Sequence, residues 1–149
     1  MEYQVVPIKG RQLISPLKEQ LLAFNQTFGW SVEQSEADFA NEYSEYYCLV
    51  DKEMVLGYVG LHHVLDEASI NHVYIQPDYR QQGLAHALIN FVLTQLAYRQ
   101  VKHLFLEVRA NNQAAIRLYE ASGFELLGRR NNYYQHPVED ALIYQKKVG

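Results

Sequence analysis

The pattern of apolar and polar positions divides the chain into segments of strand and helix character. Three neighbouring runs rich in branched and aromatic residues, YYCLVD (46–51), MVLGYVGLHHVL (54–65) and EASINHVYI (67–75), are typical of β-strands. The links between them are short enough for hairpins, so we predict an antiparallel meander. The runs YQVVPI (3–8) and HLFLEV (103–108) predict one strand before the meander and one after it.

The segment 15–28 predicts a first helix, because its apolar residues recur at helical spacing. Ser15 suits the cap of this helix and Pro16 its first position. The apolar stripe consists of Leu17, Leu21, Leu22 and Phe28.

Further helices and two closing strands are predicted along the rest of the chain. The helices are expected within 32–43, over 84–99 and over 112–122, and the strands over 124–130 and 140–146. We therefore predict a mixed α/β fold with a mostly antiparallel, twisted sheet of about seven strands and about four flanking helices. A crossover helix should follow the fourth strand, and residues 1–149 should form a single domain.

Composition and charge narrow the classes of function. The net charge of -4 argues against a protein that binds nucleic acid by neutralising phosphates. No apolar run approaches a membrane span of about 20 residues, and the first residues lack a secretory pattern. Cys48 is the only cysteine and is expected to be a small buried side chain. We therefore expect a cytoplasmic protein that binds neither membrane nor nucleic acid.

Acidic residues are concentrated in one stretch. Between Lys18 and Lys52 the chain has no basic residue. The acidic residues of this stretch include Glu33, Glu36, Asp38, Glu42, Glu45 and Asp51. They predict either a solvated acidic face or an acidic rim that attracts a cationic partner.

Two weaker patterns could indicate a metal site or RNA binding, but neither is well supported. His62 and His63 are adjacent in a strand and should point to opposite faces, so they cannot both ligate one metal ion without distortion. Arg129 and Arg130 near Tyr133 and Tyr134 suggest RNA stacking, but the acidic balance of the chain argues against it. We expect no metal.

The loop RQQGLA (80–85) stands between the predicted fourth strand and the following helix. Such a helix start exposes unpaired backbone N–H groups and can bind phosphate. Gly83 and Ala85 would let a diphosphate approach the main chain, and Arg80 could add a charged contact. The loop is neither a Walker motif nor a three-glycine dinucleotide motif, and on its own it is equally compatible with a plain helix start.

In this context, RQQGLA matches the R/Q-x-x-G-x-G/A signature of the GNAT acetyltransferases. The segment LEVRANNQAAIRLYEASGFELLGRRNNYY, followed by PVEDALIY, resembles their ribosomal-protein-alanine N-acetyltransferase branch. The resemblance implies acetyl-CoA as co-substrate, with its pyrophosphate on the amides of 81–86 and its pantetheine along 73–75. The implied cofactor-binding residues are Val73, Tyr74, Ile75, Arg80, Gln81, Gln82, Gly83, Leu84, Ala85, His86 and Asn112. Ala85 stands where the family often has glycine, and Gln81 and Gln82 stand where many members have a second base.

Two residues are candidates for the chemistry. Strand alternation puts Glu107 on one face with Phe105, where it is either a solvated carboxylate or functional. Tyr119 is either a core tyrosine or functional. By resemblance, Glu107 is the general base, Tyr119 is the general acid, and a backbone N–H near Tyr74 stabilises the oxyanion of a direct acyl transfer.

The acceptor implied by the resemblance is the α-amine of a protein N-terminus, in particular of a basic ribosomal protein. An α-amine with a pKa of about 7.8 needs only about 1 kcal/mol to become neutral at pH 7, whereas lysine needs about 4.6 kcal/mol. Trp30, Tyr133 and Tyr134 are expected on the acceptor side, where the link between RNNYY and EDA is shorter than in many relatives. A lysine or small-amine acceptor and a non-catalytic acyl-CoA-binding module remain alternatives.

Overall fold

The computed structural model describes residues 2–27 and 29–148. Phe28, which we predicted on the stripe of the first helix, lies outside the described residues. The strands are β1 (Gln4–Lys9), β2 (Ser44–Asp51), β3 (Met54–Val64), β4 (Glu67–Ile75), β5 (His103–Arg109), β6 (Glu125–Gln135) and β7 (Val138–Lys147). The α-helices are α1 (Leu17–Gln26), α2 (Val32–Ala40), α3 (Leu84–Tyr98) and α4 (Gln113–Ala121), and the short 3-10 helices are η1 (Gly10–Gln12) and η2 (Pro77–Tyr79).

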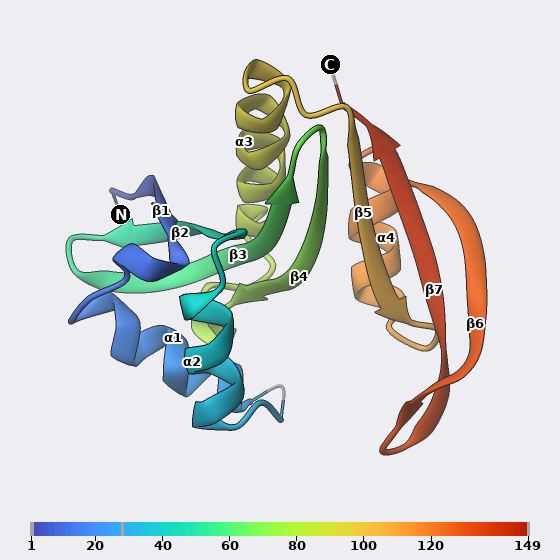
Figure 1. The fold of residues 1–149 in the computed structure, drawn as a ribbon, viewed down its shortest axis with the longest axis horizontal. Helices are drawn as coiled ribbons and strands as arrows, with labels where there is room; N and C mark the ends of the chain where they lie inside the picture. The colour runs from blue at the N-terminus through green and yellow to red at the C-terminus, as the bar shows by residue number, and fades with distance from the viewer. Residues whose placement is uncertain (1, 28, 149) are drawn as a thin grey trace.

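The strands form one sheet in the order β1-β2-β3-β4-β5-β7-β6 (Figure 1). All neighbouring strands are antiparallel except β4 and β5, which are parallel and are joined through α3. The predicted mixed α/β fold, its mostly antiparallel sheet and its crossover helix are confirmed.

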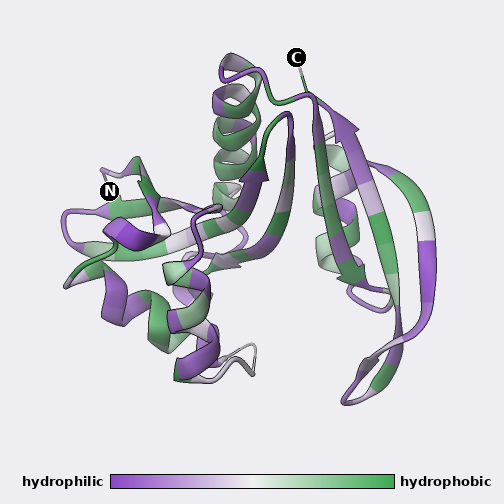
Figure 2. Ribbon diagram, in the orientation of Figure 1, coloured by the Kyte–Doolittle hydropathy of each residue, from purple (hydrophilic) through white to green (hydrophobic). Residues whose placement is uncertain are grey.

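Each face of the sheet carries its own core. Alternating side chains of β2 enter different clusters: Tyr47 and Leu49 pack with α3, whereas Tyr46, Cys48 and Val50 pack with Leu21 of α1 and Phe39 of α2. The predicted burial of Cys48 is confirmed. Figure 2 shows hydrophilic and hydrophobic residues mixed along α1 and α2, as expected for helices with one apolar side.

The parallel strands β4 and β5 stay together for only part of their length. Their register runs from Glu67 opposite His103 to Ile70 opposite Leu106. Beyond this point β4 remains paired with β3, while β5 remains paired with β7 (Figure 1). The irregularity in the β3–β4 pairing falls at Asn71, directly after the last residue that pairs with β5. The ends of β4 and β5 are therefore not paired with each other.

Two local predictions were wrong in detail. Pro16 occupies the cap position of α1 rather than its first turn, and the Ser15 hydroxyl donates to the Glu19 carboxylate instead of capping the helix. The hairpin of β6 and β7 is also longer than predicted, because the polar residues 131–135 and the segment 138–139 still belong to strands.

In the described part of the chain, no helix is both long enough and apolar enough to cross a membrane.

Candidate active site

A cleft of about 760 Å³ opens where β4 and β5 diverge, on the side of the sheet that carries α1 and α2. Trp30, Tyr133 and Tyr134, which we predicted on the acceptor side, all line this cleft. Glu107, the predicted general base, lines it as well. The fold therefore brings together four predicted residues from three segments that are far apart in the sequence.

Glu107 is placed by the alternation of β5. Leu104, Leu106 and Val108 are buried, whereas Glu107 is exposed to the cleft on the opposite face, as the alternation predicted. Its Oε1 atom lies 3.7 Å from Nη2 of Arg130. A partly exposed pair at this distance contributes little to stability, so the carboxylate stays available to a ligand in the cleft.

Tyr119 belongs to α4, and its side chain lies in the core on the other face of the sheet, together with residues of α3. Its side chain is buried, its ring packs edge-on against Phe124, and no hydrogen bond joins its hydroxyl to another described residue. Burial and the nearby Tyr134 raise the pKa of Tyr119 to about 12. Tyr119 is therefore a protonated phenol at ordinary pH, which is the state that a general acid requires.

Tyr134 interacts with the surroundings of both Glu107 and Tyr119. It lines the cleft with Glu107 and interacts electrostatically with Tyr119. Burial, with the charge of Glu107 next in effect, raises its pKa. The Arg109 guanidinium stacks over the Tyr134 ring at 4.2 Å and fixes its orientation.

The acidic pair of the EDA sequence holds the hairpin that carries both tyrosines. Glu139 accepts hydrogen bonds from the Arg109 guanidinium at 3.3 Å and the Asn111 backbone N–H at 2.7 Å. Asp140 accepts from the Arg129 guanidinium at 3.1 Å and the Asn132 backbone N–H at 2.8 Å. The motif therefore has a structural role in positioning the wall of the cleft.

The predicted phosphate loop lies at the start of α3. Gly83 occupies the cap position with φ 77°, and Gln81 also has a positive φ of 61°. No side chain caps α3 within the described residues, and its first turn contains no acidic residue. The first backbone N–H groups of the helix are therefore available to an anion.

Two side chains that we predicted to bind the cofactor, those of Arg80 and Asn112, also make contacts within the protein. Arg80 donates from Nε to the carbonyl oxygen of Ile75 at 2.7 Å and stacks on the Tyr74 ring, so part of its bonding capacity ties the loop to β4. Asn112 caps α4 by accepting from the Ala115 N–H at 3.1 Å. Both side chains have a structural partner in addition to any contact with a ligand.

The remaining predicted cofactor residues differ in exposure. Val73 and Ala85 are half-buried, Leu84 is buried, and Gln81, Gln82 and His86 are exposed. None of these side chains lines the cleft, so a ligand along β4 and the start of α3 would reach Glu107 only through the point where β4 and β5 diverge.

The sequence analysis missed a polar cluster in the wall of the cleft. Asp38 accepts a hydrogen bond from the Tyr46 hydroxyl, and its Oδ1 atom lies 2.6 Å from Nε2 of His62. Asp38 and His62 both line the cleft, as does His72, whose ring contacts Trp30 at 4.4 Å between centroids. The members come from three different strands and a helix, so no local spacing could have revealed the cluster.

The acidic stretch does not form one continuous rim. Glu45 is buried on the other side of β2, where it binds the Arg99 guanidinium through both oxygens, at 2.6 and 2.8 Å. Glu36 pairs with Lys18 at 3.1 Å. Of the acidic residues in this stretch, Asp38 is the one that lines the cleft.

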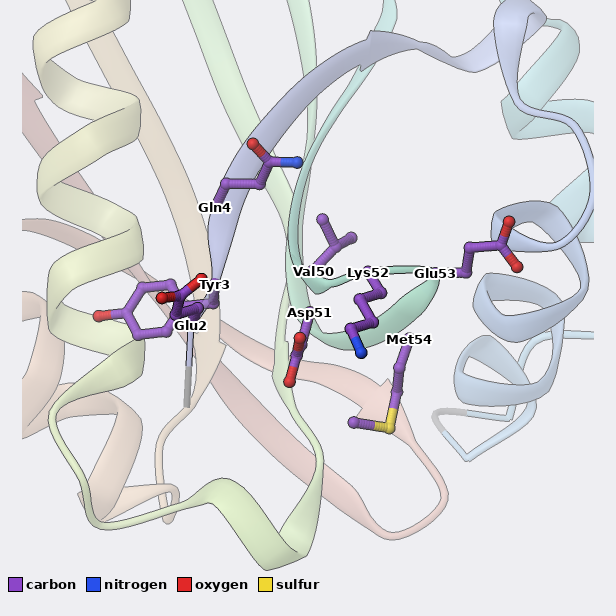
Figure 3. Close-up of a pocket in the computed structure, with 8 residues that line it drawn as sticks. All are labelled: Glu2, Tyr3, Gln4, Val50, Asp51, Lys52, Glu53 and Met54. Atoms are coloured by element: carbon purple, nitrogen blue, oxygen red, sulfur yellow. The ribbon is translucent and has the colours of Figure 1, made fainter.

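A second hollow, of about 820 Å³, lies beside β1 and the turn between β2 and β3 (Figure 3). It contains Tyr3, Asp51, Lys52 and Met54 and none of the predicted site residues. Because the residues predicted for the chemistry line the other cleft or lie elsewhere, the candidate site is the cleft beside β4 and β5.

Metal ligation finds no support in the side-chain arrangement. Across the described residues, no group of three or more His, Cys, Asp or Glu side chains could hold an ion. His62 and His63 point to opposite faces, as predicted: His62 contacts Asp38, whereas His63 contacts Glu45 and Arg99.

Comparison with known proteins agrees with this geometry. The family model described as acetyltransferase (GNAT) family matches residues 16–124. The chain belongs to the GNAT acetyltransferase family. The match spans α1 to the end of α4, and so contains the predicted phosphate loop, Glu107 and Tyr119.

Within the GNAT family, the chain is similar to one branch, the ribosomal-protein-alanine N-acetyltransferases. Over 121 residues the chain is 40% identical to the ribosomal protein bS18-alanine N-acetyltransferase of Escherichia coli K12, covering 78% of this chain and 79% of the relative. The crystal structure of the ribosomal-protein-S18-alanine N-acetyltransferase from Escherichia coli superposes with a TM-score of 0.87 at 30% identity, covering 99% of this chain and 95% of the other. The predicted resemblance to this branch is confirmed.

A more distant GNAT structure agrees at the level of the fold. Arabidopsis thaliana NAA60 in complex with acetyl-CoA has a TM-score of 0.81 at 19% identity, covering 99% of each chain. The prediction of an acetyltransferase is thus confirmed by the family, and the individual roles of the site residues remain predictions.

Proposed function

We propose that this GNAT acetyltransferase transfers acetyl from acetyl-CoA directly to the N-terminal α-amine of a protein, an alanine-starting ribosomal protein of the small subunit. The observation that carries the proposal is the position of Glu107 in an open cleft beside the diverging strands β4 and β5. The 40% identity to a bS18-alanine N-acetyltransferase supports the choice of acceptor.

Acetyl-CoA fits the residues on the far side of the divergence. The uncapped start of α3, with Gly83 in the left-handed conformation, supplies N–H groups for the pyrophosphate. The end of β4 at Val73, Tyr74 and Ile75, which lies beyond the pairing with β5, is proposed to supply backbone groups for the pantetheine. The exposed loop residues Gln81 and Gln82 give this site less positive charge than a second base would.

The chemistry requires a base near the amine and an acid near the sulfur. In the proposed reaction, the neutral amine attacks the thioester carbon, Glu107 accepts a proton from the attacking nitrogen, and the C–S bond breaks. Tyr119 gives its proton to the departing sulfur, and its buried, protonated state suits that role. A backbone N–H near Tyr74 is proposed to stabilise the oxyanion.

The acceptor side is proposed to be the wall of Trp30, Tyr133 and Tyr134. Aromatic side chains offer a rigid surface for the first residues of a peptide. Asp38 and Glu107 outnumber the one guanidinium in the cleft, that of Arg130, which favours an acceptor that brings positive charge. A cytoplasmic location and the absence of direct contact with nucleic acid or membrane stay predictions from the sequence.

The function is tested by mass spectrometry with purified protein and acetyl-CoA. One peptide has a free N-terminal alanine followed by basic residues, and a second has the same sequence, is blocked at the N-terminus and carries a lysine. We expect a gain of one acetyl group on the first peptide and none on the second. Acetylation of the blocked peptide alone would instead identify a lysine acetyltransferase.

The same assay tests the predicted base. Glu107→Gln should lower kcat by about 100-fold or more while acetyl-CoA binding is retained, because the amide cannot accept the proton. Glu125→Gln, an exposed glutamate at the start of β6, is the matched control and should keep wild-type activity. A full rate for the Glu107 variant at neutral pH would remove Glu107 from the mechanism.

A further inference from the structure

The overall acetyl transfer involves more proton movements than one carboxylate can serve. A protein N-terminus at pH 7 is mainly an ammonium, which must lose one proton before its nitrogen can attack. The nitrogen loses a second proton after attack, and the sulfur gains one as the C–S bond breaks. If Glu107 accepts the second proton and Tyr119 supplies the third, an acceptor for the first proton is still required.

The cleft contains such an acceptor in the pair of His62 and Asp38. Burial raises the pKa of Asp38, but hydrogen bonds from His62 and Tyr46 outweigh burial and leave the pKa below its usual value. Asp38 is therefore a carboxylate that can only accept hydrogen bonds, so the contact of 2.6 Å is made by a proton on Nε2 of His62. Nδ1 of His62 is left with a lone pair and has no hydrogen bond to another described residue.

The position of His62 suits this role. His62 lies opposite Ser69, which lies opposite Phe105, so these side chains share one row across the sheet. Glu107 is two residues further along β5 on the same face. With neighbouring strands about 4.8 Å apart, the Cα atoms of His62 and Phe105 are about 10 Å apart, a span that an acceptor amine with its hydration water can fill.

The other histidine in the cleft is less suited. Burial lowers the pKa of His72 to about 4, so its imidazole stays neutral and does not hold a proton near pH 7. The His62 side chain, by contrast, is about one-third exposed and is hydrogen-bonded to the Asp38 carboxylate at 2.6 Å. The titratable and charged groups around His62 are Asp38 on α2, Tyr46 on β2, His72 on β4, Glu107 on β5, and Arg130, Tyr133 and Tyr134 on β6.

We propose that His62, oriented by Asp38, takes the first proton from the acceptor ammonium and passes it to solvent, while Glu107 takes the second. The proposal rests on the proposed function. The N–H bond of the ammonium breaks, Nδ1 of His62 gains the proton, and Nε2 keeps its hydrogen bond to Asp38. The imidazolium then releases the proton to water, which accounts for the one net proton that the reaction produces.

The test compares kcat/KM for the alanine-starting peptide at pH 7 and pH 9. About one α-amine in seven is neutral at pH 7, and nearly all are neutral at pH 9. We expect His62→Gln to lose about sevenfold at pH 7 and less than twofold at pH 9, because at pH 9 the first proton has already left. Asp38→Asn should show the same pattern, whereas Glu107→Gln should be depressed at both pH values.

His63→Gln is the matched control, because it makes the same substitution one residue along, on the opposite face. It should resemble the wild type at both pH values, and thermal unfolding and acetyl-CoA binding should show that every variant is folded. A His62→Gln variant with wild-type rates, or with equal losses at pH 7 and pH 9, would overturn the proton assignment alone. Failure of the wild type to acetylate the N-terminus at either pH would overturn the proposed function and this assignment together.

Discussion

At the scale of single residues, the two proposed acid–base groups differ in environment. Glu107 faces an open cleft beside Arg130, whereas Tyr119 is buried in the core on the other face of the sheet. Burial raises the pKa of the Tyr119 phenol, which favours its protonated form. The proposed base and the proposed acid thus lie on different faces of the sheet.

Tyr119→Phe tests the acid. We expect kcat to fall by about 100-fold, because the departing thiolate must then take its proton from water. Because burial and Tyr134 raise the pKa of Tyr119 to about 12, wild-type kcat should stay level between pH 8.5 and pH 10. A steady-state pH profile measures both effects.

Tyr144→Phe is the matched control for that experiment. Tyr144 packs in the same core and donates a hydrogen bond to Glu120 at 3.0 Å, so the substitution removes a hydroxyl without touching the cleft. Its kcat should equal that of the wild type. A loss of kcat in Tyr144→Phe equal to that in Tyr119→Phe would show that the effect reflects core packing.

At the scale of elements, the proposed binding of acetyl-CoA at the start of α3 depends more on the backbone conformation of the loop than on its side chains. Gly83 has φ 77°, and a Cβ built on it would meet no protein atom within 4 Å. A side chain at this position would therefore be strained by about 1–2 kcal/mol and would project into the space in front of the helix start. Gly83→Ala should weaken acetyl-CoA binding by at least tenfold, as measured by calorimetry.

Gly29→Ala separates binding from strain. Gly29 has φ 86° and equally open surroundings, but it lies in the loop between α1 and α2. The variant should lose similar stability and bind acetyl-CoA like the wild type. Equal affinities in the wild type and in Gly83→Ala would contradict a phosphate site at this loop.

The elements also show which features could be predicted from the sequence. The alternation around Glu107 and the loop before α3 are local patterns, and they predicted the strand faces and the helix start correctly. The length of the β6–β7 hairpin was underestimated because residues 131–133 form an irregular, polar stretch that is held by Asp140, a contact that strand propensity does not encode. The start of α1 was misplaced because Ser15 bonds Glu19 rather than the helix N–H groups.

At the scale of the whole molecule, the missed features are those that depend on contacts between distant segments. Asp38, Tyr46 and His62 meet only because α2 packs across β2 and β3. The acidic stretch was expected to act as one surface, yet alternation in β2 sends Glu45 to Arg99 on the opposite face. Local periodicity predicts on which face of the sheet a side chain lies, but it does not predict which residue of another segment that side chain contacts.

The same distribution of buried groups predicts how the fold responds to alkali. Burial raises the pKa of Tyr46, Tyr58 and Tyr119, and it raises the pKa of Cys48 to about 12. In the unfolded chain these groups ionise near pH 9–10, whereas the folded protein keeps their protons. Their contribution to stability is therefore intact below about pH 9 and is lost as the pH rises toward 12.

The free energy of unfolding, measured with urea at pH 8.5, 9.5 and 10.5, should fall progressively more steeply. Each buried group that ionises only in the unfolded chain adds somewhat more than 1 kcal/mol to the loss per pH unit. Tyr58→Phe should reduce the loss of unfolding free energy per pH unit by the contribution of one ionising group. The variant also loses the hydrogen bond to Asn25, so it should be somewhat less stable at every pH. Tyr98→Phe, at a ring that is 89% exposed, should leave the slope unchanged. A stability that is flat up to pH 10.5 would mean that these groups ionise in the folded state as they do in the unfolded chain. The level kcat predicted between pH 8.5 and pH 10 from the raised pKa of Tyr119 would then lose its physical basis.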